Sequence, residues 1–139
     1  MSSTIGGFTL FPGNRVGTKP TINGERGFNY LIADRFDLTL ECIRRHYVGL
    51  GSPLKAVIER YNSFFALFVD FNSYVDFFLL NDLVSSDYST VKMFNCLPTL
   101  FESSPVPESV DSYLEYREGS MNFTRSRNIR IEAWAKNGH

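Results

Sequence analysis

Apolar residues recur at helical spacing along most of the chain and predict a mainly α-helical fold. The clearest helix covers residues 34–47, and its stripe, continued into the next turn, follows steps of four, three, four and three: Phe36, Leu40, Ile43, Tyr47 and Leu50. Another helix is expected to begin at Ser52-Pro53, because serine suits the N-cap and proline the first helical turn. Its stripe comprises Leu54, Val57, Ile58, Tyr61 and Phe65. Residues 28–33 also have a helical pattern.

The second half of the chain predicts two more helices. Residues 73–83 are nearly all apolar, so this helix is expected at the centre of the core. From Pro107 onward the pattern predicts a long C-terminal helix that is interrupted or frayed near Gly119. Its apolar stripe is thin: Val110, Leu114, Met121, Ile131 and Ala135. The basic side of this helix is expected to be solvated: Arg125, Arg127, Arg130 and Lys136.

The N-terminal region predicts a small β element. Residues 6–12 alternate as a short strand, closed by a Pro-Gly-Asn turn, and residues 13–27 follow as a loop, while 91–94 form a short strand or a turn of helix. A lone strand needs a partner from the same chain, from a second copy or from another protein. The expected fold is therefore mainly α (α+β), a compact helical domain with a small N-terminal β element, and residues 1–139 form a single domain.

Composition limits the function classes. The chain has 139 residues and a formal charge of −1 from 14 basic and 15 acidic residues, so no global field attracts nucleic acid or an anionic membrane. The apolar run 64–80 is interrupted by Asp70, Asn72 and Asp76, which predicts protein core and no membrane span. The N-terminus lacks the pattern of a signal peptide, and two cysteines do not make a disulfide framework. A cytoplasmic location is expected.

Candidate chemistry gathers between residues 20 and 47. On the helix over 34–47, Asp37, Glu41, Arg44 and Arg45 are three or four residues apart, which predicts an ion-pair ladder. Alternatively, several arginines meet basic residues of the preceding loop and bind a phosphate or a partner's carboxylate. The residues of this second interpretation are Arg15, Lys19, Arg26, Arg44 and Arg45. A second candidate surface for RNA or an acidic protein lies on the C-terminal helix at Arg125, Arg127 and Arg130, with Phe123 and Trp134.

His46 is the best candidate for a general acid or base, because its pKa is nearest neutrality. Cys42 precedes it by four residues, a spacing compatible with a shared metal, but further ligands and the H-E-x-x-H and C-x-x-C patterns are missing. No G-x-S-x-G occurs, and the loop 12–27 does not match a phosphate-binding motif. No metal and no cofactor are predicted.

Four segments carry a resemblance. They are FPGNR at 11–15, TINGERGF at 21–28, DRFDLTLECIRRHY at 34–47 and, within 64–84, YVDFFLL. With these motifs the chain resembles an uncharacterised bacterial family of unknown function, frequent in actinobacteria. The resemblance implies no activity. It also implies that this chain is a shortened member, without the segment that precedes the position of Thr4 in longer members. The strand at 6–12 would then be unpaired, and an unpaired strand edge is a template for a partner chain.

Three functional hypotheses follow. The favoured one is a non-catalytic binding or inhibitory protein that acts on a macromolecular partner, most simply a protein; its narrower form is a phage or mobile-element inhibitor of a bacterial defence complex, of the anti-CRISPR type. The first alternative is a toxin-like enzyme directed at RNA or a nucleotide, with His46 as acid or base and Arg26, Arg44 and Arg45 holding phosphate. The second alternative is a structural subunit that homodimerises through the N-terminal strand.

Overall fold

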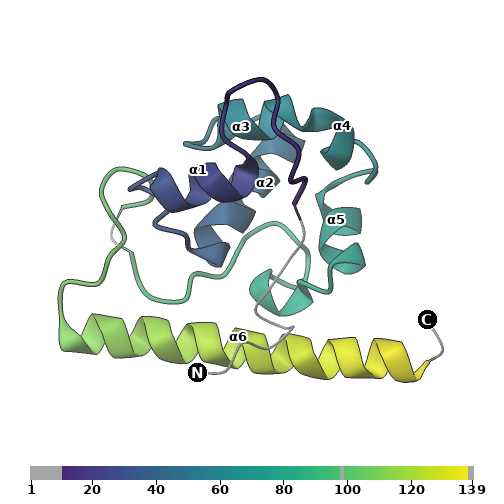
Figure 1. Ribbon diagram of the computed structural model, residues 1–139. Helices are drawn as coiled ribbons and strands as arrows, with labels where there is room; N and C mark the ends of the chain where they lie inside the picture. Colours follow the sequence, from purple (N-terminus) through teal and green to yellow (C-terminus); the bar gives the residue numbers. More distant parts are fainter. Residues whose placement is uncertain (1–10, 98, 138–139) are drawn as a thin grey trace.

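The protein is mainly helical. A computed structural model describes residues 11–97 and 99–137. In chain order its helical elements are α1 (Ile22–Phe28), α2 (Phe36–Val48), α3 (Lys55–Arg60), α4 (Asn62–Phe65), α5 (Phe71–Phe77), the 3-10 turn η2 (Asn81–Leu83) and α6 (Val110–Lys136). Figure 1 shows α1 to α5 grouped together, with α6 running as one long rod along a side of that group.

No sheet forms within the described residues. Their one extended pairing is an isolated antiparallel bridge between Val84 and Val91, so the strand or helical turn expected at 91–94 is reduced to this contact. Of the strand expected at 6–12, residues 6–10 lie outside the described residues, and Phe11 and Pro12 belong to no regular element. The mainly α class is confirmed, whereas the N-terminal β element stays a prediction.

The centre of the core is α2. Residues 37–43 are seven consecutive buried positions, so this helix is covered on every side, chiefly by α3 and α5. The helix expected at 73–83 is a different structure: α5 ends at Phe77, whose side chain is 69% exposed, and Leu79 adopts a φ of 58° that ends the helix. The prediction of a central helix there was wrong. A nearly all-apolar segment is also found where the aromatic side chains of a short helix and of the loops beside it pack against one another.

The segment before α2 also differs from expectation. The loop predicted over 13–27 contains α1, whose N-terminus is capped by Thr21: its Oγ1 accepts a hydrogen bond from the Gly24 N–H at 3.2 Å. The helix predicted over 28–33 is instead a tight turn, in which Ala33 and Asp34 adopt φ values of 51° and 59°. Two consecutive non-glycine residues in this left-handed region cost conformational energy, so the surrounding contacts must hold the turn in place.

Rings from α2, α4 and α5 form an aromatic cluster. The helix expected from Ser52 to Phe65 breaks at Tyr61, whose hydroxyl donates to the Asn14 carbonyl at 2.7 Å. Beyond this break, Phe65, Phe68, Tyr74 and Phe78 lie with neighbouring ring centroids 4.9–5.8 Å apart. Residues 64–80 therefore supply core side chains, and no helix within 11–97 and 99–137 has both the length and the apolar character to cross a bilayer.

The long helix α6 faces the body with a mixed side, on which Phe123, Thr124 and Arg127 are buried. It runs without interruption through Gly119, contrary to the predicted break, and the expected apolar stripe begins outward, with Val110 73% and Leu114 48% exposed. Arg127 is buried and donates from Nε and Nη2 to the Phe78 carbonyl, at 3.0 and 2.9 Å. Because that carbonyl lies at the C-terminal end of α5, where backbone acceptors lack helical partners, an arginine is a suitable cap.

Arg130 makes the second attachment of α6. Its guanidinium donates to both carboxylate oxygens of Asp82, at 2.6 and 3.1 Å. With Arg127 it fixes the rotation of α6, so the side expected to be solvated is the side that holds the helix to the body. Of the predicted basic face, Arg127 alone is buried; Arg125, Arg130 and Lys136 are exposed, with Arg130 paired to Asp82.

Candidate functional site

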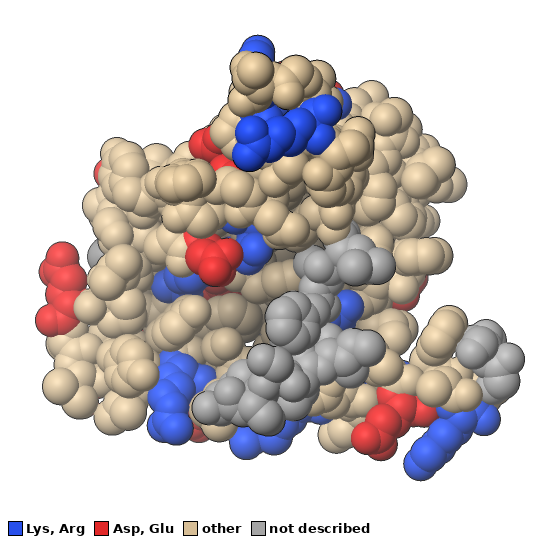
Figure 2. All heavy atoms as spheres, in the orientation of Figure 1, with Lys and Arg blue, Asp and Glu red and all other residues tan. Residues whose placement is uncertain are grey.

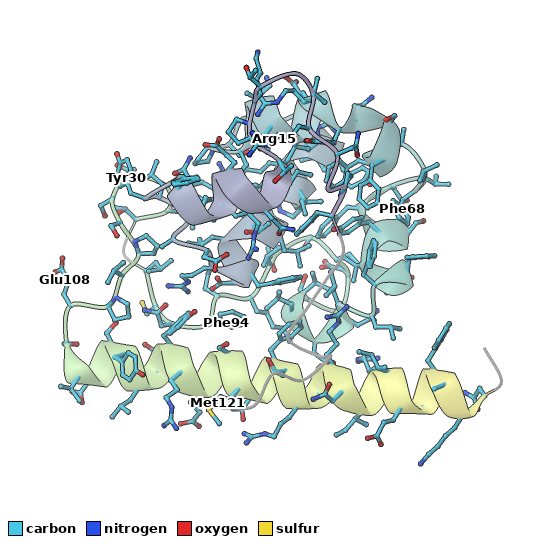
Figure 3. All side chains as sticks on the ribbon, viewed as in Figure 1. Arg15, Tyr30, Phe68, Phe94, Glu108 and Met121 are labelled. Carbon is cyan, nitrogen blue, oxygen red and sulfur yellow. The ribbon has the colours of Figure 1, made fainter. Side chains whose placement is uncertain are left out.

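A pocket of about 510 Å³ lies between α1, the start of α2 and the inner side of α6. This volume is within the usual range for sites that bind small ligands or single side chains. The lining combines five aromatic rings with one arginine, one carboxylate and several neutral polar groups: Phe11, Asn23, Arg26, Asp34, Phe36, Phe94, Tyr116, Ser120, Phe123 and Thr124. We call it the Arg26 pocket. Figure 3 shows Phe94 between α2 and α6, where the group of helices α1 to α5 faces α6.

Arg26 is the cation of this pocket. Its Nε donates to Thr39 Oγ1 at 2.7 Å, Nη2 donates to the Asp34 carbonyl at 3.2 Å, and Nη1 pairs with Asp34 Oδ1 at 3.2 Å. The rings of Phe11 and Phe36 lie 5.9 and 6.0 Å from its Cζ. Burial lowers the pKa of Arg26 and Asp34 opposes this, but a guanidinium remains charged at any physiological pH. The pocket therefore presents a fixed positive charge inside aromatic walls.

The two members of the Arg26–Asp34 pair differ in exposure. The Arg26 side chain is only 12% exposed, whereas the side chain of Asp34 is 72% exposed. An exposed carboxylate returns to water at little cost, so a competing anion can take its place on the guanidinium. The strained turn at Ala33 and Asp34 holds the carboxylate and the Asp34 carbonyl at the pocket edge, and such strain is often retained at functional sites.

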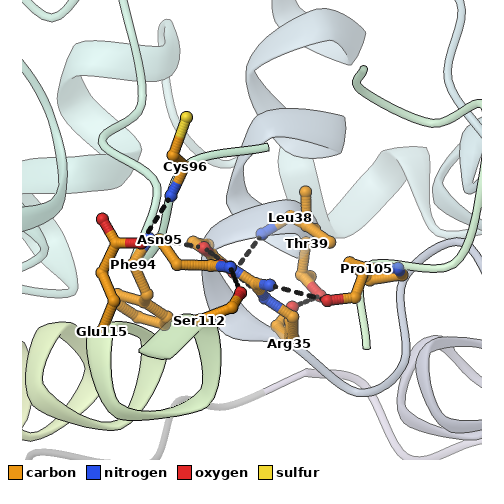
Figure 4. A network of polar contacts seen from close by, with 10 residues as sticks. Arg35, Leu38, Thr39, Phe94, Asn95, Cys96, Pro105, Ser112 and Glu115 are labelled. Carbon is orange, nitrogen blue, oxygen red and sulfur yellow. Dashed lines mark hydrogen bonds and ion pairs between the residues drawn. The ribbon is translucent and has the colours of Figure 1, made fainter. Parts of the chain in front are cut away.

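Arg35, labelled in the polar network of Figure 4, forms a buried ion pair with Asp37 that contacts two walls of the pocket. Arg35 and Asp37 have side chains 3% and 0% exposed, and Arg35 Nε and Nη2 donate to the two carboxylate oxygens of Asp37 at 3.0 and 2.5 Å. Asp37 Oδ2 also accepts from the backbone N–H of Phe94 at 2.9 Å, and the Arg35 guanidinium lies 4.6 Å from the ring of Tyr116. The pair thus positions two pocket walls that come from distant parts of the chain.

Arg44 and Arg45 are held by one carboxylate. Arg44 Nε and Nη2 donate to the two oxygens of Glu41, each at 2.8 Å, and Arg45 Nε donates to Glu41 Oε2 at 2.7 Å. The Arg45 guanidinium also lies 4.9 Å from the Phe101 ring. This arrangement matches the ladder interpretation for Glu41, Arg44 and Arg45, but Asp37 belongs to the separate pair with Arg35. Neither Arg44 nor Arg45 lines the Arg26 pocket.

The charge of Glu41 gives a pH-dependent prediction. Its burial acts to raise the pKa, but the hydrogen bonds from Arg44 and Arg45 prevail and hold the pKa below its ordinary value. The stabilisation is therefore complete above the unfolded-chain pKa of about 4.3 and is lost as the pH falls through the lower folded-state pKa. We expect Glu41→Gln to reduce the free energy of unfolding by about 1–2 kcal/mol at pH 7, and by less at pH 3.

Urea unfolding of wild type and Glu41→Gln at pH 7, 5 and 3, followed by circular dichroism, measures this difference. Glu59→Gln, at an exposed glutamate, is the matched control and should stay within about 0.5 kcal/mol of wild type throughout. A Glu41→Gln deficit that stays constant from pH 7 to pH 3 would show that the charge of Glu41 is not its source.

His46 does not line the Arg26 pocket. Its Nε2 is 3.2 Å from Asn62 Oδ1, and its ring packs against Tyr47 and Phe65 with centroids 5.7 and 5.6 Å away. The hollow beside it has a volume of about 80 Å³, and neither Arg26 nor the Glu41-bound arginines line it. Burial raises the pKa of the Cys42 thiol to about 11. Across the described residues, no three His, Cys, Asp or Glu side chains are grouped as metal ligands.

The other predicted binding residues are dispersed. Arg15 and Lys19 are exposed in the loop before α1, and Figure 3 shows Arg15 at the end of the molecule remote from α6. Arg125 is exposed on α6 and hydrogen bonds to Asn122. Of the residues predicted from sequence to contact a partner, Arg26 and Phe123 line the pocket.

Sequence reasoning named only Phe123 of the α6 wall, as part of a surface for RNA or an acidic protein, and missed the rest of this wall. Tyr116, Ser120, Phe123 and Thr124 follow at helical steps, but two of the four are polar, so a search for an apolar stripe passes over them. A search for mixed aromatic and hydroxyl positions on one helix face would have found this wall. The Phe94 wall has no such local signal, because a backbone hydrogen bond to Asp37, 57 residues away, places it.

Comparison with known proteins gives a family without a function. A family model described as a family of unknown function (DUF6994) matches residues 1–131. No curated protein and no solved structure matches the chain. The expectation of an uncharacterised family is confirmed to that extent, whereas its motifs, its actinobacterial distribution and a missing N-terminal part stay predictions.

Proposed function

The chain belongs to DUF6994, a family of unknown function, and we propose that it is a non-catalytic binding protein whose Arg26 pocket receives an anionic side chain of a protein partner. One observation carries this proposal. A nearly buried guanidinium, engaged on one side by Thr39, has an exposed carboxylate as its counter-ion on the other. A partner's carboxylate can replace Asp34, form charge-assisted hydrogen bonds and bury its aliphatic stem against the surrounding rings.

The distribution of charge favours a protein partner over RNA. An RNA surface needs several cations along a phosphate track, because each phosphate carries a charge. Here Arg44 and Arg45 are bound to Glu41, and Arg130 is bound to Asp82. Figure 2 shows Lys and Arg side chains spread over this face with Asp and Glu among them, without one continuous track. A lone, nearly buried guanidinium such as that of Arg26 is suited to one carboxylate at a time.

The test uses opposite changes at one ion pair. The tagged protein captures partners from bacterial lysate with and without nuclease treatment, mass spectrometry and gel electrophoresis identify them, and calorimetry measures each affinity. We expect Arg26→Met to weaken the affinity at least about tenfold, because it removes the charge-assisted hydrogen bonds. Asp34→Asn should strengthen binding a few-fold, since it removes the competing carboxylate and asparagine tolerates the left-handed backbone there.

Lys92→Met, which removes an exposed cation outside the pocket, is the matched control and should bind as wild type does. Circular dichroism of every variant separates lost binding from lost folding. Recovery of RNA alone, or a partner whose affinity is equal for wild type and Arg26→Met, would contradict the proposal. An affinity that falls in Asp34→Asn would show that Asp34 contacts the partner and does not compete with it.

The alternatives have less support. The toxin-like enzyme needs His46 and its arginines in one cleft, whereas His46 packs with Asn62 and Phe65 at a separate, smaller hollow. The homodimer through the N-terminal strand rests on residues 6–10, outside the described ones. The narrower hypothesis of a phage inhibitor of a defence complex stays a prediction.

A further inference from the structure

The outward side of α6 carries one regular stripe of alternating character. Leu114, Glu118, Met121, Arg125 and Ile129 follow at steps of four, three, four and four, so they lie along one line of the helix. This line is opposite the buried side of α6, which includes Phe123 and Arg127. Leu114 and Ile129 are 48% and 69% exposed. Figure 3 shows Met121 on the side of α6 turned away from the other helices.

Within residues 114–129 the stripe is complementary to itself when its direction is reversed; beyond its ends, the same pairing brings the exposed carboxylates of Asp111 and Glu132 towards each other, which limits the strength of the contact. Read forward, it is apolar, acidic, apolar, basic, apolar; read backward, it is apolar, basic, apolar, acidic, apolar. An antiparallel copy therefore places Leu114 against Ile129, Glu118 against Arg125, and Met121 against itself. A parallel copy in register places Glu118 against Glu118 and Arg125 against Arg125, where like charges repel.

We propose that this stripe is an interface with a second copy of the chain, in which two α6 helices pack antiparallel about a two-fold axis near Met121. Such an axis makes the contact isologous, so each copy supplies the same side chains and both ion pairs form at once. A shallow hollow of about 310 Å³ on this side, lined by Leu114, Arg117, Glu118, Met121 and Arg125, offers room for a side chain of the second copy.

The size of the contact sets its strength. Residues 114–129 span roughly 24 Å of helix, which gives an interface near the lower limit for a specific complex. We therefore expect a reversible dimer with a dissociation constant on the order of 10–100 μM. The Arg26 pocket lies on the inner side of α6, so dimerisation and partner binding are separate properties and either can fail without the other.

Charge reversal on two exposed residues tests the arrangement. Arg125→Glu leaves two acidic positions and Glu118→Arg leaves two basic positions, so each variant alone should be monomeric in sedimentation equilibrium from about 10 μM to 1 mM. An equimolar mixture should form a heterodimer, because each acidic position then meets a basic one. The double variant Glu118→Arg/Arg125→Glu should dimerise as wild type does. Lys136→Met, an exposed cation beyond the stripe, should leave the dimer unchanged.

The orientation has its own readout. In a Cys96→Ser background, which removes the exposed native thiol, Leu114→Cys mixed with Ile129→Cys should give a disulfide between the two different chains under mild oxidation. Rapid disulfides between two Leu114→Cys chains would overturn the antiparallel arrangement. A wild-type chain that is monomeric at 1 mM would overturn the interface, and so would a wild-type dimer that Arg125→Glu leaves intact.

Discussion

Asp37→Asn is expected to reduce the free energy of unfolding by about 3–5 kcal/mol, enough to unfold a marginally stable domain. Asp37 is fully buried, and its two oxygens accept four hydrogen bonds, two from Arg35 and one each from the backbone N–H groups of Leu38 and Phe94. Asparagine replaces one oxygen with an amide nitrogen that faces donors. It also leaves the buried Arg35 guanidinium without its counter-charge, which accounts for most of the expected loss.

Asp34→Asn is the matched control, because it makes the same chemical change at another arginine-paired aspartate, one that is exposed. We expect its effect to stay below about 1 kcal/mol. Urea unfolding followed by circular dichroism compares the two variants at pH 7. If Asp37→Asn fails to fold, Arg35→Lys is the milder variant. Lysine keeps the positive charge but cannot donate two parallel hydrogen bonds to the two Asp37 oxygens. We expect it to reduce the free energy of unfolding by more than Asp34→Asn does. Equal losses in all variants would show that burial of the Arg35–Asp37 pair is not important for stability.

Helices were predicted correctly where the pattern of residues within the segment itself indicates a helix. The stripe of α2 and the helical pattern that follows Pro107 are both visible in the sequence, and α2 and α6 both form. The helix α1 was missed because Gly24 and Gly27 lower helix propensity, although Thr21 supplies the cap. The turn at Ala33 and Asp34 has no local signal, since neither residue is glycine.

The orientation of α6 was predicted wrongly for a long-range reason. Hydrophobic periodicity assumes that apolar residues face the core, but Arg127 and Arg130 find their acceptors at Phe78 and Asp82, 49 and 48 residues earlier. Once those arginines face the body, Leu114 is left outside. The same limit applies to the site: the sequence drew attention to Arg26 as a charge, while its aromatic surroundings depend on how Phe94 and α6 pack.

Gly119→Ala is expected to destabilise the protein, although glycine in the interior of a helix usually costs about 0.5–1 kcal/mol relative to alanine. A Cβ at this position would lie 2.5 Å from the Phe94 carbonyl oxygen and 3.0 Å from its Cα. Both are backbone atoms, and the hydrogen bond from the Phe94 N–H to Asp37 holds that segment in place. Because neither side can yield cheaply, we expect a loss of about 1–3 kcal/mol in the free energy of unfolding.

Gly27→Ala provides the control of opposite sign. Gly27 is also helical, but a Cβ there meets nothing within 4 Å, so alanine should stabilise by about 0.5–1 kcal/mol. Thermal and urea unfolding of the two variants tests whether α6 lies directly on the Phe94 segment. Stabilisation by both substitutions would mean that this close approach does not exist. The Arg26 pocket would then lose a wall as well, because Phe94 and Tyr116 line it from the two sides of that contact.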